Sequence, residues 1–334
     1  MRVAVFSSKA YDREFLSGAN DLNNLGPTHE LIFHEVALNL NTVMLAKDCG
    51  AVCCFVNDQL DAPVLNALAR LGVKLIALRC AGFNQVDIVA ATELGLCVAR
   101  VAEYSPHAIA EHALGLILML NRNLHRAYNR IRENDYALNG LLGFDLVNKT
   151  VAIIGTGKIG SILAHIMKGI GCNIIAYDPY PNNELIAQGT QYCSLDEIWR
   201  RADIISLHCP LTPATHHLIN SETIAQMKDG VMLINTGRGG LIDTPAVIKG
   251  LKSKKFGYVG LDVYEEEAEL FFEDQSNLLL QDDVFARLLT FPNVVITGHQ
   301  AFFTREALSE IGRVTLANIS YFERSELEKI CRVN

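Results

Sequence analysis

A glycine-rich hexapeptide in the middle of the chain limits its possible folds more than any other feature. Its members are Gly155, Thr156, Gly157, Lys158, Ile159 and Gly160. The apolar run 151–154 leads into it, and a helical pattern over 161–169 follows. A strand, a glycine turn and a helix in this order bind the pyrophosphate of dinucleotides, because the glycines let the backbone and the helix N-terminus approach the phosphates. We therefore predict a dinucleotide site; the alternative is a tight turn without a ligand.

Asp178 predicts which dinucleotide binds. It ends the next strand-like run, 174–177, about 20 residues beyond the glycines, where an acid accepts hydrogen bonds from the adenosine ribose. The same carboxylate repels the 2′-phosphate of NADP, and the segment 179–183 contains no Lys or Arg that could bind that phosphate. We therefore predict NAD as the cofactor. The alternative is an exposed Asp at the end of a strand.

Short apolar runs alternate with helical patterns on both sides of the hexapeptide. The strand-like runs before it are 3–6, 31–36, 51–56, 74–78 and 97–101. The later ones are 150–154, 173–177, 204–208, 231–235, 258–261 and 294–297. This alternation is typical of parallel sheets whose two faces are covered by helices. The sequence therefore predicts an α/β fold with two doubly wound parallel sheets.

Two helical patterns lie outside this alternation. One runs over 105–132 and is longer than a typical globular helix, so we expect a connector between domains or a subunit interface. The other, an amphipathic pattern over 305–323, could pack on either half of the chain.

Composition and charge exclude several classes of protein. The net charge is −8, from 29 basic and 37 acidic residues, and the chain contains no block of Lys or Arg. This argues against binding to nucleic acid and to an anionic membrane surface. The apolar run 113–120 is too short to span a bilayer, and the N-terminal run is too short for a secretion signal. Nine cysteines without zinc, redox or disulfide spacing indicate a reducing cytoplasm, and no residue set has metal-ligand spacing.

Several motifs together resemble the D-isomer-specific 2-hydroxyacid dehydrogenases along nearly the whole chain. They are RCAGFN at 79–84, YSPHA at 104–108, NTGRGGLID at 235–243, GLDVYEEE at 260–267, LFFED at 270–274 and GHQAF at 298–302. The motifs at 270–274 and 298–302 resemble the fermentative D-lactate dehydrogenase branch in particular. The resemblance implies hydride transfer between NADH and a small 2-keto acid, with pyruvate to D-lactate as the first expectation.

The resemblance also implies the catalytic residues. Reduction of a keto acid needs a cation for the carboxylate, an acid for the carbonyl oxygen and a group that keeps this acid charged. By resemblance, Arg238 would hold the carboxylate, His299 would exchange the proton, and Glu267 would keep His299 protonated. The chemistry alone does not choose between Glu265, Glu266 and Glu267; the resemblance prefers Glu267.

Further roles follow from the same resemblance. The backbone N–H groups near Ala81 and Gly82 would also meet the substrate carboxylate, and Tyr104 would line the pocket. Thr236 and Asp262 would lie at the cofactor, with Asp262 near the nicotinamide carboxamide. The chain departs from the family at Gly237, where the family often has Ser.

The family's architecture implies two domains, one interrupting the other. Residues 1–101 and 299–334 would form a flavodoxin-like substrate domain, and 102–298 an NAD-binding Rossmann domain, with the active site in the cleft between them. A homodimer or larger homo-oligomer is expected. Two alternatives remain: a dehydrogenase for hydroxypyruvate, glyoxylate or a branched 2-keto acid, and a dinucleotide-sensing regulator.

Overall fold

The computed structural model describes residues 1–22, 28–267, 270–272 and 274–334, and the chain forms two compact units. The first unit consists of the two ends of the chain, Met1–Ser105 and Phe303–Asn334, and the second unit is Pro106–Phe302. The borders predicted from the sequence, after residues 101 and 298, lie a few residues before these.

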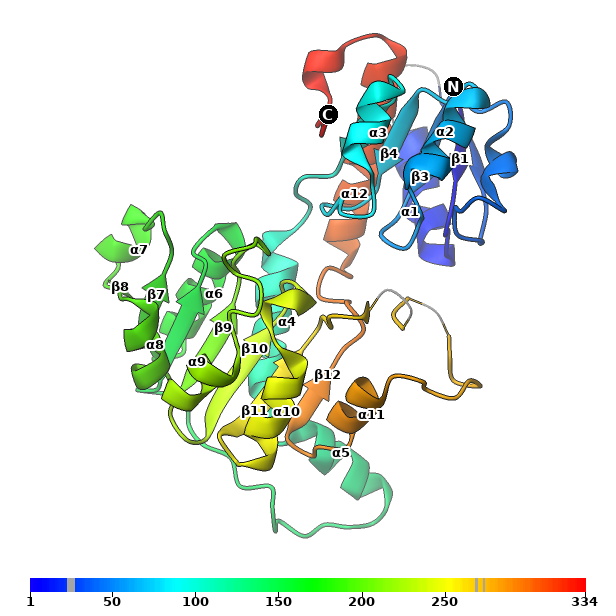
Figure 1. Ribbon diagram of the computed structural model, residues 1–334. Helices are drawn as coiled ribbons and strands as arrows, with labels where there is room; N and C mark the ends of the chain where they lie inside the picture. Colours follow the sequence, from blue (N-terminus) through cyan, green and yellow to red (C-terminus); the bar gives the residue numbers. More distant parts are fainter. Residues whose placement is uncertain (23–27, 268–269, 273) are drawn as a thin grey trace. The chain divides into compact units, whose positions relative to one another are not determined.

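The first unit is built on a sheet of five parallel strands (Figure 1). The strands are β1 (Arg2–Val5), β2 (Glu30–Phe33), β3 (Ala51–Cys54), β4 (Leu75–Leu78) and β5 (Cys97–Arg100). Their order across the sheet is β2-β1-β3-β4-β5. This is the order of flavodoxin-like folds, so the fold class predicted for this part of the chain is confirmed.

Helices pack on both faces of this sheet, because every residue of β3 and β4 is apolar and buried. The helices are α1 (Ala10–Asp21), α2 (Ala62–Arg70), α3 (Ile88–Glu93) and α12 (Arg305–Glu323), with single turns η1 (Val43–Ala46) and η4 (Leu327–Lys329). Val52 of β3 shares a buried cluster with Leu65 of α2, whereas Cys53 shares another with Leu316 of α12. The C-terminal helix therefore belongs to the first unit, a question that its amphipathic pattern alone left open.

The second unit is built on a larger parallel sheet. Its strands are β6 (Thr150–Ile154), β7 (Asn173–Tyr177), β8 (Gln191–Tyr192), β9 (Ile204–Leu207), β10 (Val231–Asn235), β11 (Phe256–Leu261) and β12 (Val294–Ile296). The order β12-β11-β10-β9-β6-β7-β8 reverses direction between β6 and β9. This is the Rossmann order, in which ligands bind at the carboxyl ends of the strands near that reversal.

Two helical layers cover this second sheet (Figure 1). The helices are α4 (Pro106–Asn121), α5 (Leu124–Arg132), α6 (Lys158–Gly169), α7 (Asn183–Ala187), α8 (Leu195–Arg201), α9 (Ser221–Gln226), α10 (Thr244–Lys252) and α11 (Asp283–Leu289), with the single turn η2 (Gly239–Leu241). Ile153 of β6 packs in a buried cluster with residues of α4 and α6. Its neighbour Ile154 belongs to a cluster that contains Trp199 of α8 and residues of α9, α10 and α11.

The long helix predicted over 105–132 is wrong, because two helices, α4 and α5, occupy this region. Asn123 separates them with φ +51° in the left-handed region, a conformation that Asn adopts more readily than most residues. Its side-chain amide donates to the carbonyl oxygen of Leu142, 3.4 Å away. The apolar periodicity continued across the break, so the pattern alone did not show it.

Candidate active site

The glycine turn joins the end of β6 to the start of α6. Gly155 has φ +94°, and a Cβ there would lie 2.5 Å from the backbone nitrogen of Cys209. A Cβ on Gly160 would collide with the carbonyl oxygen of Gly155, so both positions require glycine. Gly157 instead faces open space at the N-terminus of α6. The turn is closed towards the protein and open at the helix N-terminus, a shape that fits a pyrophosphate.

Asp178 lies beside this turn at the end of β7. Its Oδ2 accepts a 2.7 Å hydrogen bond from the backbone N–H of Thr156, and its Oδ1 accepts a 2.8 Å bond from that of Tyr180. The Thr156 hydroxyl accepts a further bond from the Tyr192 hydroxyl at 2.8 Å. These contacts hold the half-buried carboxylate next to the glycines, where the ribose of NAD binds in folds of this type.

The other residues predicted to bind the cofactor include one buried group without a partner. The hydroxyl of Thr236, which follows β10, is buried and makes no hydrogen bond with any described residue. A buried polar atom without a partner is costly, so this hydroxyl fits a bound ligand that supplies one. Lys158 and Ile159 form the first turn of α6, the former exposed and the latter half-buried.

His299 and Glu267 form a close pair. The His299 Nδ1 lies 2.8 Å from the Glu267 Oε1, and each side chain is 23% exposed. The second oxygen of Glu267 accepts a 3.0 Å bond from the backbone N–H of Tyr264, which fixes the carboxylate. Within the described part of the chain, the Nε2 of His299 has no hydrogen-bond partner. The imidazole therefore carries one nitrogen tied to a carboxylate and one available for proton exchange.

The two neighbouring acids are placed elsewhere. The Oε1 of Glu265 lies 2.6 Å from the Nε2 of His217. Its Oε2 accepts hydrogen bonds from the backbone N–H of Thr244 at 3.1 Å and from the Thr244 hydroxyl at 2.7 Å. Glu266 is exposed. Of the three acids between which the chemistry could not choose, the one that contacts His299 is thus Glu267, as the resemblance implied; its catalytic role remains a prediction.

The carboxylate of Asp262 organises the segment that carries His299. It is fully buried; its Oδ1 accepts bonds from the Thr297 hydroxyl at 2.5 Å and the Gln300 N–H at 2.9 Å. Its Oδ2 accepts from the Ala301 N–H at 2.9 Å, and its carbonyl oxygen accepts from the His299 N–H at 2.7 Å. Residues 297–301 thus wrap around one carboxylate, and His299 takes φ +51° within that turn. The assignment of Asp262 to the cofactor stays a prediction.

Arg238 lies on a loop that packs against the turn leading to Glu267. Its side chain is half-buried, and its Nη1 donates to the carbonyl oxygen of Gly237 at 2.8 Å. Asn235 closes the loop by donating to the Arg238 carbonyl oxygen at 2.9 Å. A Cβ on Gly239 would collide with the backbone of Tyr264, so glycine is required there. At Gly237 a Cβ would have no atom closer than 3.5 Å, so the backbone has room for the family's Ser.

The substrate residues predicted in the first unit follow β4 and β5. Arg100 donates to the carbonyl oxygen of Ala81 at 2.8 Å, and the thiol of Cys80 donates to that of Gly82 at 3.2 Å. Burial raises the pKa of Cys80 to about 12, so the thiol is a neutral donor. Tyr104 is half-buried and lines a cavity of about 390 Å³. These residues belong to the first unit, whereas Arg238, Glu267 and His299 belong to the second.

Comparison with known proteins decides the family. Residues 114–301 match the family model described as D-isomer specific 2-hydroxyacid dehydrogenase, NAD binding domain. The chain is 53% identical over 319 residues to a 2-hydroxyacid dehydrogenase homolog of Haemophilus influenzae, covering 96% of this chain and 95% of the relative. It is 50% identical over 326 residues to the D-lactate dehydrogenase of Escherichia coli, covering 98% of each. The chain belongs to the D-isomer-specific 2-hydroxyacid dehydrogenases.

A solved structure of the pyruvate reductase of Chlamydomonas reinhardtii has the same fold. It superposes with a TM-score of 0.93 at 45% identity and covers 97% of each chain. Like its family, this 2-hydroxyacid dehydrogenase is an NAD-dependent oxidoreductase, so the predictions of family, fold class, enzyme class and cofactor are confirmed. The roles of the individual residues remain predictions.

His112 is a residue that the sequence gave no reason to place at the dehydrogenase site. It lies on α4, and its Nε2 is 3.0 Å from the Thr297 hydroxyl and 3.3 Å from Asp262. Because the Thr297 hydroxyl donates to Asp262, it can accept from the His112 N–H. Burial raises the pKa of Asp262, but hydrogen bonds from His112, Thr297 and two backbone N–H groups outweigh it and hold that pKa below its usual value. His112 thus helps to keep the carboxylate behind His299 ionised.

We expect His112→Leu to lower kcat about 10-fold, since the turn around Asp262 loses one of its bonds to a charged group. His112→Gln keeps an N–H donor in reach and should retain most of the activity. The measurement is kcat for the keto-acid reduction together with the Kd for NADH, which should change little in either variant. Wild-type kcat in His112→Leu would show that this contact does not position His299.

Proposed function

We propose that this dehydrogenase interconverts pyruvate and D-lactate. The observation that carries the proposal is the His299–Glu267 pair, with an available Nε2, in a chain half identical to the D-lactate dehydrogenase of Escherichia coli over 98% of both chains. The similarity to the pyruvate reductase of Chlamydomonas reinhardtii supports the same substrate. A pair of this kind suits proton exchange with a carbonyl or hydroxyl oxygen.

In the proposed mechanism, Arg238 binds the carboxylate of the keto acid through its guanidinium fork. The His299 Nε2 holds a proton and gives it to the carbonyl oxygen as the carbon is reduced. When bound, NADH supplies the hydride. The products are the 2-hydroxy acid, NAD⁺ and a neutral His299, which takes up a proton from solvent; lactate oxidation runs through the same steps in reverse. The substrate contacts assigned to Ala81, Gly82 and Tyr104 remain predictions.

Glu267 sets the charge of His299 in this mechanism. Its Oε1 faces the Nδ1, so the carboxylate favours the protonated imidazole that reduction requires. Tyr264 holds Glu267 through a backbone N–H, so the carboxylate stays in place when His299 loses its proton. Asp178 supplies the preference for NAD over NADP, because its fixed carboxylate repels a 2′-phosphate.

We also propose a cytoplasmic location and a homo-oligomer. All nine cysteines lie in the described part of the chain and are free thiols, which suits a reducing compartment. No helix of the described residues is long and apolar enough to cross a membrane.

Helix α5 buries none of its residues and exposes Leu124, Tyr128 and Ile131, an apolar surface that a second subunit would cover. A purified chain that sediments as a monomer would contradict the homo-oligomer.

A substrate panel tests the proposed function. With NADH, we expect kcat/KM to be highest for pyruvate among pyruvate, hydroxypyruvate, glyoxylate and a branched 2-keto acid, and the product to be D-lactate by chiral analysis. NADPH should be used about 100-fold less efficiently, because a fixed carboxylate faces its 2′-phosphate. A clear preference for hydroxypyruvate would replace the proposed substrate, and equal use of NADPH would contradict the role of Asp178.

The pH dependence tests the catalytic pair. Pyruvate reduction should fall with rising pH as His299 deprotonates, and lactate oxidation should rise over the same range. In Glu267→Gln the negative charge that faces the imidazole is lost, so both limbs should move to lower pH. Glu266→Gln is the matched control, since Glu266 is exposed, and its profile should equal that of the wild type. An unchanged limb in Glu267→Gln would refute the pairing as the source of the pH dependence.

A further inference from the structure

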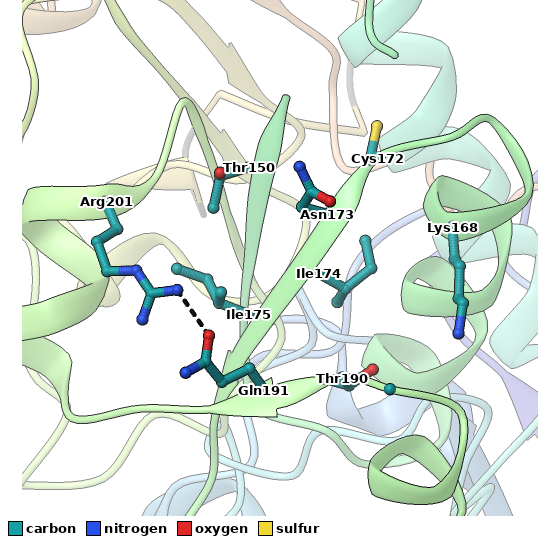
Figure 2. A pocket seen from close by; sticks show the side chains of 10 residues that line it. Thr150, Lys168, Cys172, Asn173, Ile174, Ile175, Thr190, Gln191 and Arg201 are labelled. Carbon is teal, nitrogen blue, oxygen red and sulfur yellow. Dashed lines mark hydrogen bonds between the residues drawn. The ribbon is translucent and has the colours of Figure 1, made fainter. Parts of the chain in front are cut away.

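A cavity of about 410 Å³ opens in the second unit at the amino ends of β6 and β7. Figure 2 shows Thr150 and Asn173, the first residues of these strands, among the side chains around it. The glycine turn that binds the dinucleotide follows the other end of β6. The cavity is therefore separate from the dinucleotide site, and its volume lies within the range of small-molecule sites.

The charge of the cavity lining is opposite to that of the chain. Lys168 and Arg201 line it, and none of its described lining residues is acidic, although the chain has a net charge of −8. The Arg201 guanidinium donates to the Gln191 side-chain oxygen at 2.6 Å. A dashed line marks this bond in Figure 2. The nearest carboxylate to Arg201 is that of Glu197 at 3.9 Å, a weak and exposed pair. An anion that enters the cavity thus meets an oriented cation.

Lys168 is the second cation of the lining. Its ammonium makes no hydrogen bond or ion pair with any described residue. It lies over the turn between α7 and β8, since a Cβ added to Gly189 would be 3.7 Å from the Lys168 Nζ. Gly189 has φ +87° and lines the cavity, so a side chain there would be strained and would crowd the ammonium.

Two hydroxyl groups in the lining also make no hydrogen bond with the residues that the structure describes. Thr190 is only 6% exposed, and its hydroxyl makes no hydrogen bond with any described residue; only its backbone N–H is bonded, to the Leu185 carbonyl oxygen at 2.9 Å. The Thr150 hydroxyl is likewise without a partner within the described residues. Neither hydroxyl oxygen is fully enclosed by protein, so both hydroxyls are free to donate to the oxygens of a ligand in the cavity.

We propose that this cavity binds a small anion carrying phosphoryl groups, in addition to the dinucleotide. Two cations and two unpartnered hydroxyl donors match the several oxygens and the charge of such a group. One helix, α6, links the two sites: Gly160 of the glycine turn lies in its first turn, and Lys168 of the cavity lies in its last turn. Binding requires only this cavity and does not depend on which keto acid is the substrate.

The test is calorimetric titration of inorganic pyrophosphate into the enzyme saturated with NAD, at constant ionic strength. Saturation with NAD occupies the glycine turn, which could itself bind pyrophosphate. We expect one site per chain, with a Kd that rises about 10-fold in Thr190→Val and in Lys168→Met. Lys252→Met is the matched control, because Lys252 is also in the last turn of a helix, α10, and does not line the cavity. Its Kd should equal that of the wild type.

Three results would overturn the proposal. One is the absence of binding at millimolar pyrophosphate. Another is a Kd that does not distinguish the cavity variants from the control: it is unchanged in both Thr190→Val and Lys168→Met, or it rises in Lys252→Met as much as in these two variants. The third is binding to the free enzyme that disappears when NAD is saturating, which would place the anion at the glycine turn. The kcat/KM for pyruvate should be the same in all three variants without pyrophosphate, since none of these residues belongs to the proposed catalytic machinery.

Discussion

The buried carboxylate of Asp262 is the interaction on which the candidate active site depends. A fully buried charge is stable only if it is hydrogen-bonded, and here the donors come from Thr297, Gln300 and Ala301 on either side of His299. Because residues 297–301 donate these hydrogen bonds to the Asp262 carboxylate, they form a turn around it. The turn holds His299 in a left-handed conformation that most residues avoid. The orientation of the imidazole towards Glu267 is therefore a consequence of where a carboxylate is buried.

The topology of the second unit brings the remaining candidates to the same edge. Gly155, Asp178, Arg238, Asp262 and His299 each follow the carboxyl end of a strand, after β6, β7, β10, β11 and β12 in turn. In a parallel sheet these ends lie together, so residues far apart in sequence share one edge. The proposed catalytic residues and the cofactor site thus lie at the carboxyl ends of the strands, and the proposed anion cavity lies at the amino ends of β6 and β7.

The parts that could be predicted from the sequence are those set by local patterns. The apolar runs marked most strands, the glycine hexapeptide marked the turn after β6, and the helix over 305–323 has those bounds in the structure. The short edge strand β8 was missed because two residues carry no periodicity. The break at Asn123 was missed because the apolar pattern continued across it. Glu273, in the motif 270–274, lies outside the described residues.

The parts that could not be predicted depend on contacts between distant segments. The spacing of Glu265, Glu266 and Glu267 could not show which acid meets His299, since that depends on how two loops pack. His112 reaches Thr297 and Asp262 only through the packing of α4 on the sheet.

The role of Asp262 is tested most directly by Asp262→Asn, which keeps the shape but replaces one acceptor oxygen with an amide that cannot accept a hydrogen bond. The measurement is kcat for pyruvate reduction beside the Kd for NADH, with the fold checked by circular dichroism. If Asp262 acts by holding His299, kcat should fall about 100-fold while the Kd for NADH changes little. A normal kcat would contradict the account, and a loss confined to NADH binding would make Asp262 a ligand of the cofactor instead.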